Sequence, residues 1–179
     1  IDNIYLIIRK MGEKMLSVYP KAYFDKIEKI TIEFIQKNHL KALILDMDNT
    51  LINYKKEMPE NIEKWAKDLK GQGTKLYILS NTNKKTKVKN IAEKLDIPYR
   101  SFAKKPLKSG FLKVQKELGY KPEQIGVVGD QIFTDIVGGN RCNMFTILID
   151  AIDDKDFWYT LWKRPLEKML KKKFREKGL

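Results

Sequence analysis

Two acidic residues, Asp46 and Asp48, directly follow an apolar run in the stretch ALILDMDNTLI, which spans residues 42–52. A buried strand that leaves a sheet for a polar loop needs only one polar residue at that point, and two neighbouring carboxylates repel each other. The alternative is a site that uses both acids, one to attack a substrate and one to move protons. The other polar residues of the chain and their positions distinguish these two interpretations.

Hydrolysis of a phosphate ester is a reaction that would use such a pair. Asp46 can attack phosphorus and form an aspartyl-phosphate, while Asp48 protonates the leaving oxygen and later deprotonates water. Because the two carboxylates repel each other, we expect a divalent cation beside them. Asp130, in the segment VVGD, offers a third oxygen ligand. Oxygen ligands suit Mg²⁺, so the expected metal ligands are Asp46, Asp48 and Asp130.

Other polar residues have the chemistry to hold the phosphoryl group. Ser80, with the amide of Asn81, can hydrogen-bond the phosphoryl oxygens, and Lys105 in AKKPLKSG can place a positive charge opposite the metal. Arg141 in GGNRCN could reach a substrate anion or lie on the surface. These residues are far apart in the sequence, so the fold must bring them together.

Alternating strands and helices would do this. Lysine-rich amphipathic stretches at 59–70, 84–95 and 107–118 separate the apolar runs and have helical spacing. The pattern predicts an α/β fold with a doubly wound, Rossmann-like parallel sheet that carries helices on both faces. In such sheets ligands bind beyond the carboxyl ends of the strands, where Asp46, Asp48, Ser80 and Asp130 fall. The expected strands lie within residues 41–48, 74–81, 98–102, 123–130 and 144–150.

Length predicts a single domain of residues 1–179. It divides into an N-terminal helical segment (1–40), a catalytic core (41–150) and a basic C-terminal helical tail (151–179). Within the first segment, Ile1, Ile4, Ile8, Met11 and Met15 fall at helical spacing, which indicates a helix over the sheet or one that faces a membrane. Tyr23 to Gln36 suggests another helix or an irregular wrap.

The net charge of +13 comes mostly from lysine. A positive field favours anionic partners such as an acidic membrane face, a phosphorylated substrate or nucleic acid, although lysine enrichment also follows from solubility and genome composition. The apolar run IYLII at 4–8 is far shorter than the ~18 residues that span a bilayer, so no transmembrane helix is expected. The single cysteine, Cys142, fits a reducing, cytoplasmic compartment.

Four ordered motifs, DMDNT, ILSN, KKP and GDQIFTD, resemble those of the haloacid dehalogenase (HAD) superfamily of phosphatases. The resemblance implies that Asp48 acts as the proton donor, which favours a hydrolase. Lys105, directly before a proline, matches the motif lysine better than Lys104. Asp135 is expected either to support the metal ligands without binding the metal itself or to cap a helix. Thr50 is expected to hydrogen-bond the loop and turn it.

The gaps between the motifs leave no room for a cap domain, because each holds about one helix and one strand. The site is therefore expected to be open, which suits a bulky substrate or one presented on a surface. The tail at 163–179 carries eight basic and two acidic residues and follows an aromatic cluster that contains Trp158 and Trp162. This combination indicates a peripheral membrane contact, an RNA contact or an amphipathic helix packed on the core.

Most of the chain, from Val18 to Leu170, is similar to the YqeG-type HAD phosphatases, which are related to the mitochondrial phosphatidylglycerophosphate phosphatase. This implies hydrolysis of phosphatidylglycerophosphate to phosphatidylglycerol at the inner face of the cytoplasmic membrane. The subgroup often has two asparagines after the motif serine, whereas this chain has Asn81 and then Thr82. Other possible substrates are a soluble sugar phosphate, a nucleotide or a nucleic-acid end. A basic RNA- or ribosome-binding module with a vestigial site is a third possibility.

Overall fold

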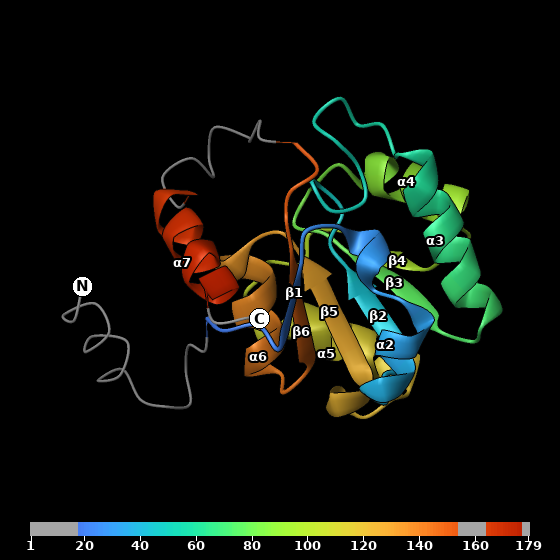
Figure 1. The fold of residues 1–179 in the computed structure, drawn as a ribbon. Helices are drawn as coiled ribbons and strands as arrows, with labels where there is room; N and C mark the ends of the chain where they lie inside the picture. Colours follow the sequence, from blue (N-terminus) through green and yellow to red (C-terminus); the bar gives the residue numbers. More distant parts are fainter. Residues whose placement is uncertain (1–17, 154–163, 177–179) are drawn as a thin grey trace.

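The computed structural model describes residues 18–153 and 164–176, and these form a six-stranded sheet with helices on both faces (Figure 1). All neighbouring strands are parallel, in the order β1-β6-β5-β2-β3-β4. The predicted doubly wound parallel sheet is confirmed, and each predicted strand segment contains a strand. The strands are β1 (Ala22–Phe24), β2 (Ala42–Leu45), β3 (Lys75–Leu79), β4 (Tyr99–Arg100), β5 (Ile125–Gly129) and β6 (Phe145–Ile149).

The helices lie in two layers because successive strand residues point to opposite faces of the sheet. On one face Leu43 and Leu45 of β2 pack with the helices at 32–37, 60–71 and 85–95, and on the other Ile44 packs with the helix at 108–118. Both faces of β2 are therefore buried. The helices are η1 (Ile27–Lys29), α2 (Ile32–Lys37), α3 (Glu60–Gly71), α4 (Lys85–Leu95), α5 (Lys108–Leu118), η2 (Pro122–Gln124), η3 (Ile132–Ile136, a π-helical turn), α6 (Val137–Arg141) and α7 (Arg164–Glu176).

The three predicted amphipathic helices form with boundaries within one residue of those expected. Trp65 of α3 is buried, and its indole N–H donates to the carbonyl of Ile30 at 2.9 Å. In α5, Phe111 is fully buried, whereas the neighbouring Leu112 is 47% exposed. In α5 the buried stripe therefore includes Phe111 and leaves Leu112 at its exposed margin.

Strand β1 was not predicted. The segment from Tyr23 was expected to be helical or irregular, but Ala22–Phe24 pairs in parallel with β6 at the edge of the sheet. The strand has only three residues, all half-buried, so it lacks the continuous apolar run that revealed the central strands. Helix α2 does form further on, with the Thr31 hydroxyl accepting from the N–H of Phe34. The predicted helix through Ile1–Met15 lies outside the described residues.

The connections that follow β2 and β3 are short. Between β2 and β3 the only helix is α3, and between β3 and β4 the only helix is α4. Neither connection contains a cap domain, as expected from the spacing of the motifs. The carboxyl ends of β2, β3 and β5 therefore open directly at one edge of the sheet, here called the catalytic edge and marked by Asp46, Ser80 and Asp130.

Helix α7 packs beside η3 and α6. Phe174 is fully buried in a cluster with Ile132, Ile136 and Leu148. The guanidinium of Arg175 donates to Asp150 at 2.6 Å and ties the end of the helix to the residue after β6. Among residues 18–153 and 164–176, no helix has both the length and the apolar character needed to cross a bilayer. The predicted contacts of Trp158 and Trp162 lie outside the described residues.

Candidate active site

Asp46 is positioned by the sheet. It follows the last residue of β2, and its backbone N–H donates to the carbonyl of Val128 on β5 at 2.9 Å. The chain then turns at Asn49, whose φ of 61° is left-handed. The hydroxyl of Thr50 is buried and has no hydrogen-bond partner among the described residues, so the loop contact expected of it is not found. Its backbone N–H instead donates to the carbonyl of Met47 at 3.4 Å.

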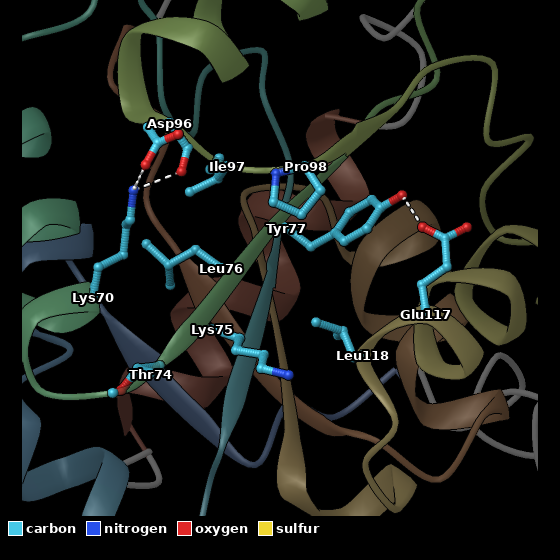
Figure 2. Close-up of a pocket in the computed structure, with 11 residues that line it drawn as sticks. Lys70, Thr74, Lys75, Leu76, Tyr77, Asp96, Ile97, Pro98, Glu117 and Leu118 are labelled. Atoms are coloured by element: carbon cyan, nitrogen blue, oxygen red, sulfur yellow. Dashed lines mark hydrogen bonds and ion pairs between the residues drawn. The ribbon is translucent and has the colours of Figure 1, made fainter.

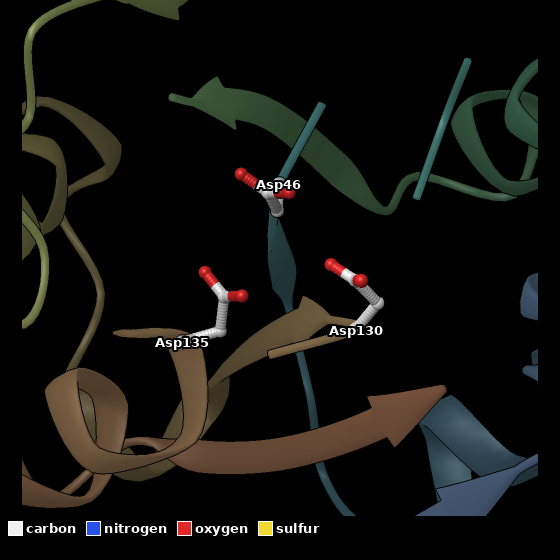
Figure 3. A group of neighbouring side chains, drawn as sticks. All are labelled: Asp46, Asp130 and Asp135. Carbon is white, nitrogen blue, oxygen red and sulfur yellow. The ribbon is translucent and has the colours of Figure 1, made fainter. Parts of the chain in front are cut away.

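Three buried carboxylates meet at the catalytic edge (Figure 3). Asp46 follows β2, Asp130 follows β5 and Asp135 lies in η3, and each offers an oxygen within 4.8 Å of the others. Gly129 makes this approach possible, because a Cβ at that position would lie under 3.0 Å from the side chain of Asp135. Asp135 therefore belongs to the carboxylate cluster itself.

Lys105 is the cation of this cluster. Its ammonium donates to Asp46 at 2.5 Å and to Asp135 at 2.6 Å, and its side chain is only 3% exposed. Lys104 is exposed, and its ammonium lies 5.0 Å from the centre of the Phe102 ring. The geometry thus separates the two candidate lysines, since only Lys105 contacts the acids.

The electrostatics of the cluster favour a bound cation. Burial raises the pKa of the Asp46 carboxyl to about 8, against the lowering effect of Lys105 and with help from Asp135 and Asp130. Burial opposes the charge of Lys105, but Asp135 and Asp46 raise the pKa of its ammonium above the ordinary value. Three carboxylates and one ammonium give a formal charge of −2, which a divalent cation would neutralise.

The donor atoms of this cluster fit Mg²⁺, because they are all carboxylate oxygens. The predicted metal ligands were Asp46, Asp48 and Asp130. The structure brings Asp46 and Asp130 together, and Asp135 completes the group in place of the carboxylate of Asp48. Asp48 pairs instead with Lys87 in the first turn of α4. The Asp48 side chain is partly exposed, at 22%.

Ser80 and Asn81 lie where β3 ends. The Ser80 side chain is buried, and its hydroxyl accepts from the N–H of Thr82 at 3.2 Å. The side-chain amide of Asn81 is bonded to the backbone of Lys105, accepting from its N–H at 2.6 Å and donating to its carbonyl at 3.0 Å. The Asn81 side chain thus holds the lysine loop, a role that we had not assigned to it.

Arg141 contacts the same loop from another direction. Its guanidinium donates to the carbonyl of Pro106 at 3.2 Å. The half-buried side chain therefore braces the residue after Lys105, and its contact with a substrate anion stays a prediction.

A separate pocket of about 460 Å³ lies at the amino end of β3 (Figure 2). Its charged side chains are engaged by one another or by neighbours: Lys70 bonds to Asp96 at 2.9 Å, and the Tyr77 hydroxyl donates to Glu117 at 2.5 Å. Burial, and then the hydrogen bond with Glu117, raises the pKa of the Tyr77 phenol to about 12. The converging carboxylates lie at the opposite end of the strands, so the catalytic edge is the candidate active site.

Comparison with known proteins agrees with this geometry. The family model described as mitochondrial PGP phosphatase matches residues 3–152. The probable phosphatase YqeG of Bacillus subtilis is 34% identical over 161 residues, which cover 89% of this chain and 92% of that protein. The chain belongs to this phosphatase family.

Solved structures show the same fold at lower identity. An uncharacterized protein from Listeria monocytogenes serotype 4b is 20% identical with a TM-score of 0.54, over 66% of this chain and 85% of that chain. A protein from Porphyromonas gingivalis described as a predicted HAD-like family hydrolase is 15% identical with a TM-score of 0.54, over 72% and 98% of the two chains. The phosphatase therefore has the HAD fold, and the resemblance drawn from its four motifs is confirmed.

Two residues of the phosphatase that contact its site were missed from the sequence. Lys87 is one of many lysines in amphipathic helices, and nothing in its spacing marks it as the partner of Asp48. Glu167 of α7 is buried and accepts from the backbone N–H groups of Ile132 and Phe133, at 3.0 and 3.4 Å. The sequence did contain a signal for the burial of Glu167, because this acid lies on the apolar stripe of α7 two helical turns before Phe174.

Proposed function

We propose that this phosphatase hydrolyses phosphatidylglycerophosphate to phosphatidylglycerol with Mg²⁺ as its cofactor, through an aspartyl-phosphate on Asp46. The observation that carries the chemistry is the convergence of Asp46, Asp130 and Asp135 around Lys105 at an uncapped sheet edge. The ion pair with Lys105 holds the Asp46 carboxylate in place, and a divalent cation in the cluster would offset the negative charge that otherwise repels a phosphoryl group.

In the first half-reaction a carboxylate oxygen of Asp46 attacks phosphorus and the bond to the ester oxygen breaks. Asp48 donates its proton to that oxygen and the alcohol leaves. In the second half, Asp48 accepts a proton from water, the water oxygen attacks phosphorus, and the bond to Asp46 breaks with release of phosphate. Ser80 and the amide of Asn81 would hydrogen-bond the phosphoryl oxygens.

Asp46, Asp130 and Asp135 would hold the metal, and the ammonium of Lys105 would balance part of their negative charge. Asp48 would be a further ligand from the loop that follows β2. When bound, Mg²⁺ supplies charge neutralisation for the transferring phosphoryl group. The role of Lys105 is to keep Asp46 oriented and to stabilise negative charge on the phosphoryl group.

The lipid substrate is supported by the family description and by the absence of a cap over this edge. A site with no lid can accept a phosphate that projects from a bilayer, and the basic chain favours an anionic leaflet. We accordingly place the enzyme at the inner, cytoplasmic face of the membrane.

The test is phosphate release from phosphatidylglycerophosphate in vesicles, with and without Mg²⁺, beside a panel of soluble sugar phosphates, nucleotides and 5′-phosphorylated oligonucleotides. We expect the lipid to be the preferred substrate, turnover to require Mg²⁺, and Asp46→Asn to abolish turnover while circular dichroism shows an intact fold. A preference for a soluble ester would reassign the substrate. Tight RNA binding without turnover of any ester would instead indicate a binding module.

A further inference from the structure

Three neighbouring loops at the catalytic edge expose a dense set of lysines. The loops follow β2, β3 and β4, which are adjacent in the sheet, so their tips lie side by side. Residues 53–57, 82–86 and 102–108 contain a single acid, Glu57, which is bonded to Asn53. The exposed lysines of these loops are Lys55, Lys56, Lys84, Lys85, Lys104 and Lys108.

Large apolar side chains project from the same loops. Phe102 is 61% exposed, Leu107 is 50% exposed and Tyr54 is 47% exposed. Phe102 and Leu107 flank the catalytic Lys105 on the loop between β4 and α5. We call these three side chains and the six exposed lysines the catalytic rim.

The backbone holds Phe102 outward at a conformational cost. Its φ is 53° and that of Lys104 is 54°, and a bulky residue in this left-handed region is an outlier. The conformation is fixed because the N–H of Phe102 donates to the carbonyl of Thr82 at 2.9 Å, and that of Ala103 to the carbonyl of Ser80 at 3.0 Å. A strained residue whose apolar side chain faces solvent beside an active site points to a function outside the folded core.

We propose that the catalytic rim docks on an anionic lipid bilayer, with Phe102 and Leu107 entering the interface and the lysines contacting the head groups. This rests on the proposed function, because a lipid phosphate ester must meet Asp46 at the membrane surface. The proposal goes further than the function, because it assigns the membrane contact to the catalytic rim. It does not require α7 or the chain ends to touch the bilayer. The rim would thereby orient the open site toward the bilayer.

The side-chain chemistry favours a lipid surface over nucleic acid. Lysines alone would serve either partner, since both carry phosphates. An aromatic ring can stack on an unpaired base, but an aliphatic side chain such as Leu107 has no such partner on a nucleic acid. A bilayer interface accepts both, because it combines acyl chains with anionic head groups.

The test is co-sedimentation of the full chain with vesicles of phosphatidylglycerol and phosphatidylcholine, and with phosphatidylcholine alone. The variant is Phe102→Asn with Leu107→Ser. Asn tolerates a left-handed backbone, and Leu107 precedes the first turn of α5, where Ser is a favourable cap. We therefore expect an undiminished melting temperature, with a fall in vesicle partitioning of roughly tenfold or more.

A charge-matched pair of variants tests the lysines. Lys85→Gln with Lys104→Gln should weaken binding to the anionic vesicles roughly tenfold, whereas Lys41→Gln with Lys116→Gln should not. The control lysines are also exposed but lie before β2 and towards the end of α5, away from the catalytic edge. Both variants remove the same net charge, so a difference between them locates the contact.

Three results would overturn the proposal. The first is unchanged vesicle binding in the Phe102→Asn, Leu107→Ser variant. The second is an equal loss on Met169→Ser, which removes an exposed apolar side chain from α7. The third is loss of single-stranded RNA binding in the rim variants while vesicle binding persists. These readouts do not depend on turnover, so a failure of the lipid phosphatase assay would be recognised separately.

Discussion

Asn81 and Lys105 are joined by two hydrogen bonds between a side-chain amide and a backbone. The N–H of Lys105 donates to Oδ1 of Asn81 at 2.6 Å, and Nδ2 of Asn81 donates to the carbonyl of Lys105 at 3.0 Å. The lysine side chain extends from this anchored backbone to Asp46 and Asp135. The end of β3 therefore sets the position of the cation that contacts the proposed nucleophile.

Replacing Asn81 by Ala should reduce turnover more than it weakens substrate binding. Both backbone groups of Lys105 would lose their partner, at a cost of about 1–3 kcal/mol, and the ammonium would lose its fixed position. We expect kcat on a soluble aryl phosphate to fall roughly 10- to 100-fold. Asn81→Asp keeps the acceptor and should fall between Ala and the wild type. Asn83→Ala, in the same exposed loop, is the control, and an Asn81→Ala enzyme as fast as this control would contradict the assignment.

Magnesium should raise the melting temperature of the wild-type protein, because a ligand that binds only the folded state stabilises it. In Asp130→Asn the carboxylate cluster loses one negative charge and one ligand. The metal-free variant should therefore melt a few degrees above the metal-free wild type, since about 1 kcal/mol corresponds to roughly 2–4 °C at this size. Its response to Mg²⁺ should shrink. Differential scanning fluorimetry with the exposed-surface variant Glu123→Gln as control measures both effects, and an unaltered Mg²⁺ response would exclude Asp130 as a ligand.

Lys87 should affect catalysis by positioning Asp48, without contacting the phosphoryl group itself. Its ion pair fixes the carboxylate that is proposed to protonate the leaving oxygen. We expect Lys87→Met to lower kcat about tenfold with little change in KM, and Lys87→Arg to restore most of the rate. Lys89→Met is a matched control, because Lys89 pairs with Glu93 on the exposed side of the same helix. A loss confined to KM would show that Lys87 binds substrate instead.

The meeting of the acids could be predicted from the sequence because it depends on simple regularities. Continuous apolar runs marked the central strands, and parallel strands end at one edge of a sheet. Asp46, Ser80 and Asp130 follow such runs, so their proximity followed from topology alone. Lys105 could be singled out from Lys104 only by resemblance, and the structure separates them by burial.

The remaining contacts depend on packing that no local pattern encodes. Strand β1 has three residues, all half-buried, and owes its pairing to the free edge of β6. Asp135 joins the acid cluster because Gly129 leaves space for its side chain, a relation that becomes visible only in three dimensions. The place of Lys87 opposite Asp48 depends on how α4 lies over the loop that follows β2.

Glu167 should link helix α7 to catalysis. It is a buried carboxylate that accepts from the N–H groups of Ile132 and Phe133, which lie between Asp130 and Asp135. Glu167→Leu would leave these two donors without that acceptor, at about 1–3 kcal/mol each, so the melting temperature should drop by roughly 5–10 °C. The same change frees the backbone that carries two of the proposed metal ligands, so Mg²⁺ affinity and kcat should fall together.

Two companion variants separate this role from a general loss of helix packing. Glu167→Gln retains an oxygen acceptor and should recover most of the Mg²⁺ affinity, whereas Glu176→Leu changes an exposed acid at the end of the same helix and should alter neither property. The measurements are thermal melting, Mg²⁺ titration and turnover of a soluble ester. If Glu167→Leu lost stability but bound Mg²⁺ as tightly as the wild type, α7 would be a packing element alone. If Glu167→Leu lost stability, Mg²⁺ affinity and turnover together and Glu167→Gln restored them, this helix would be shown to hold the loop from Asp130 to Asp135 in place.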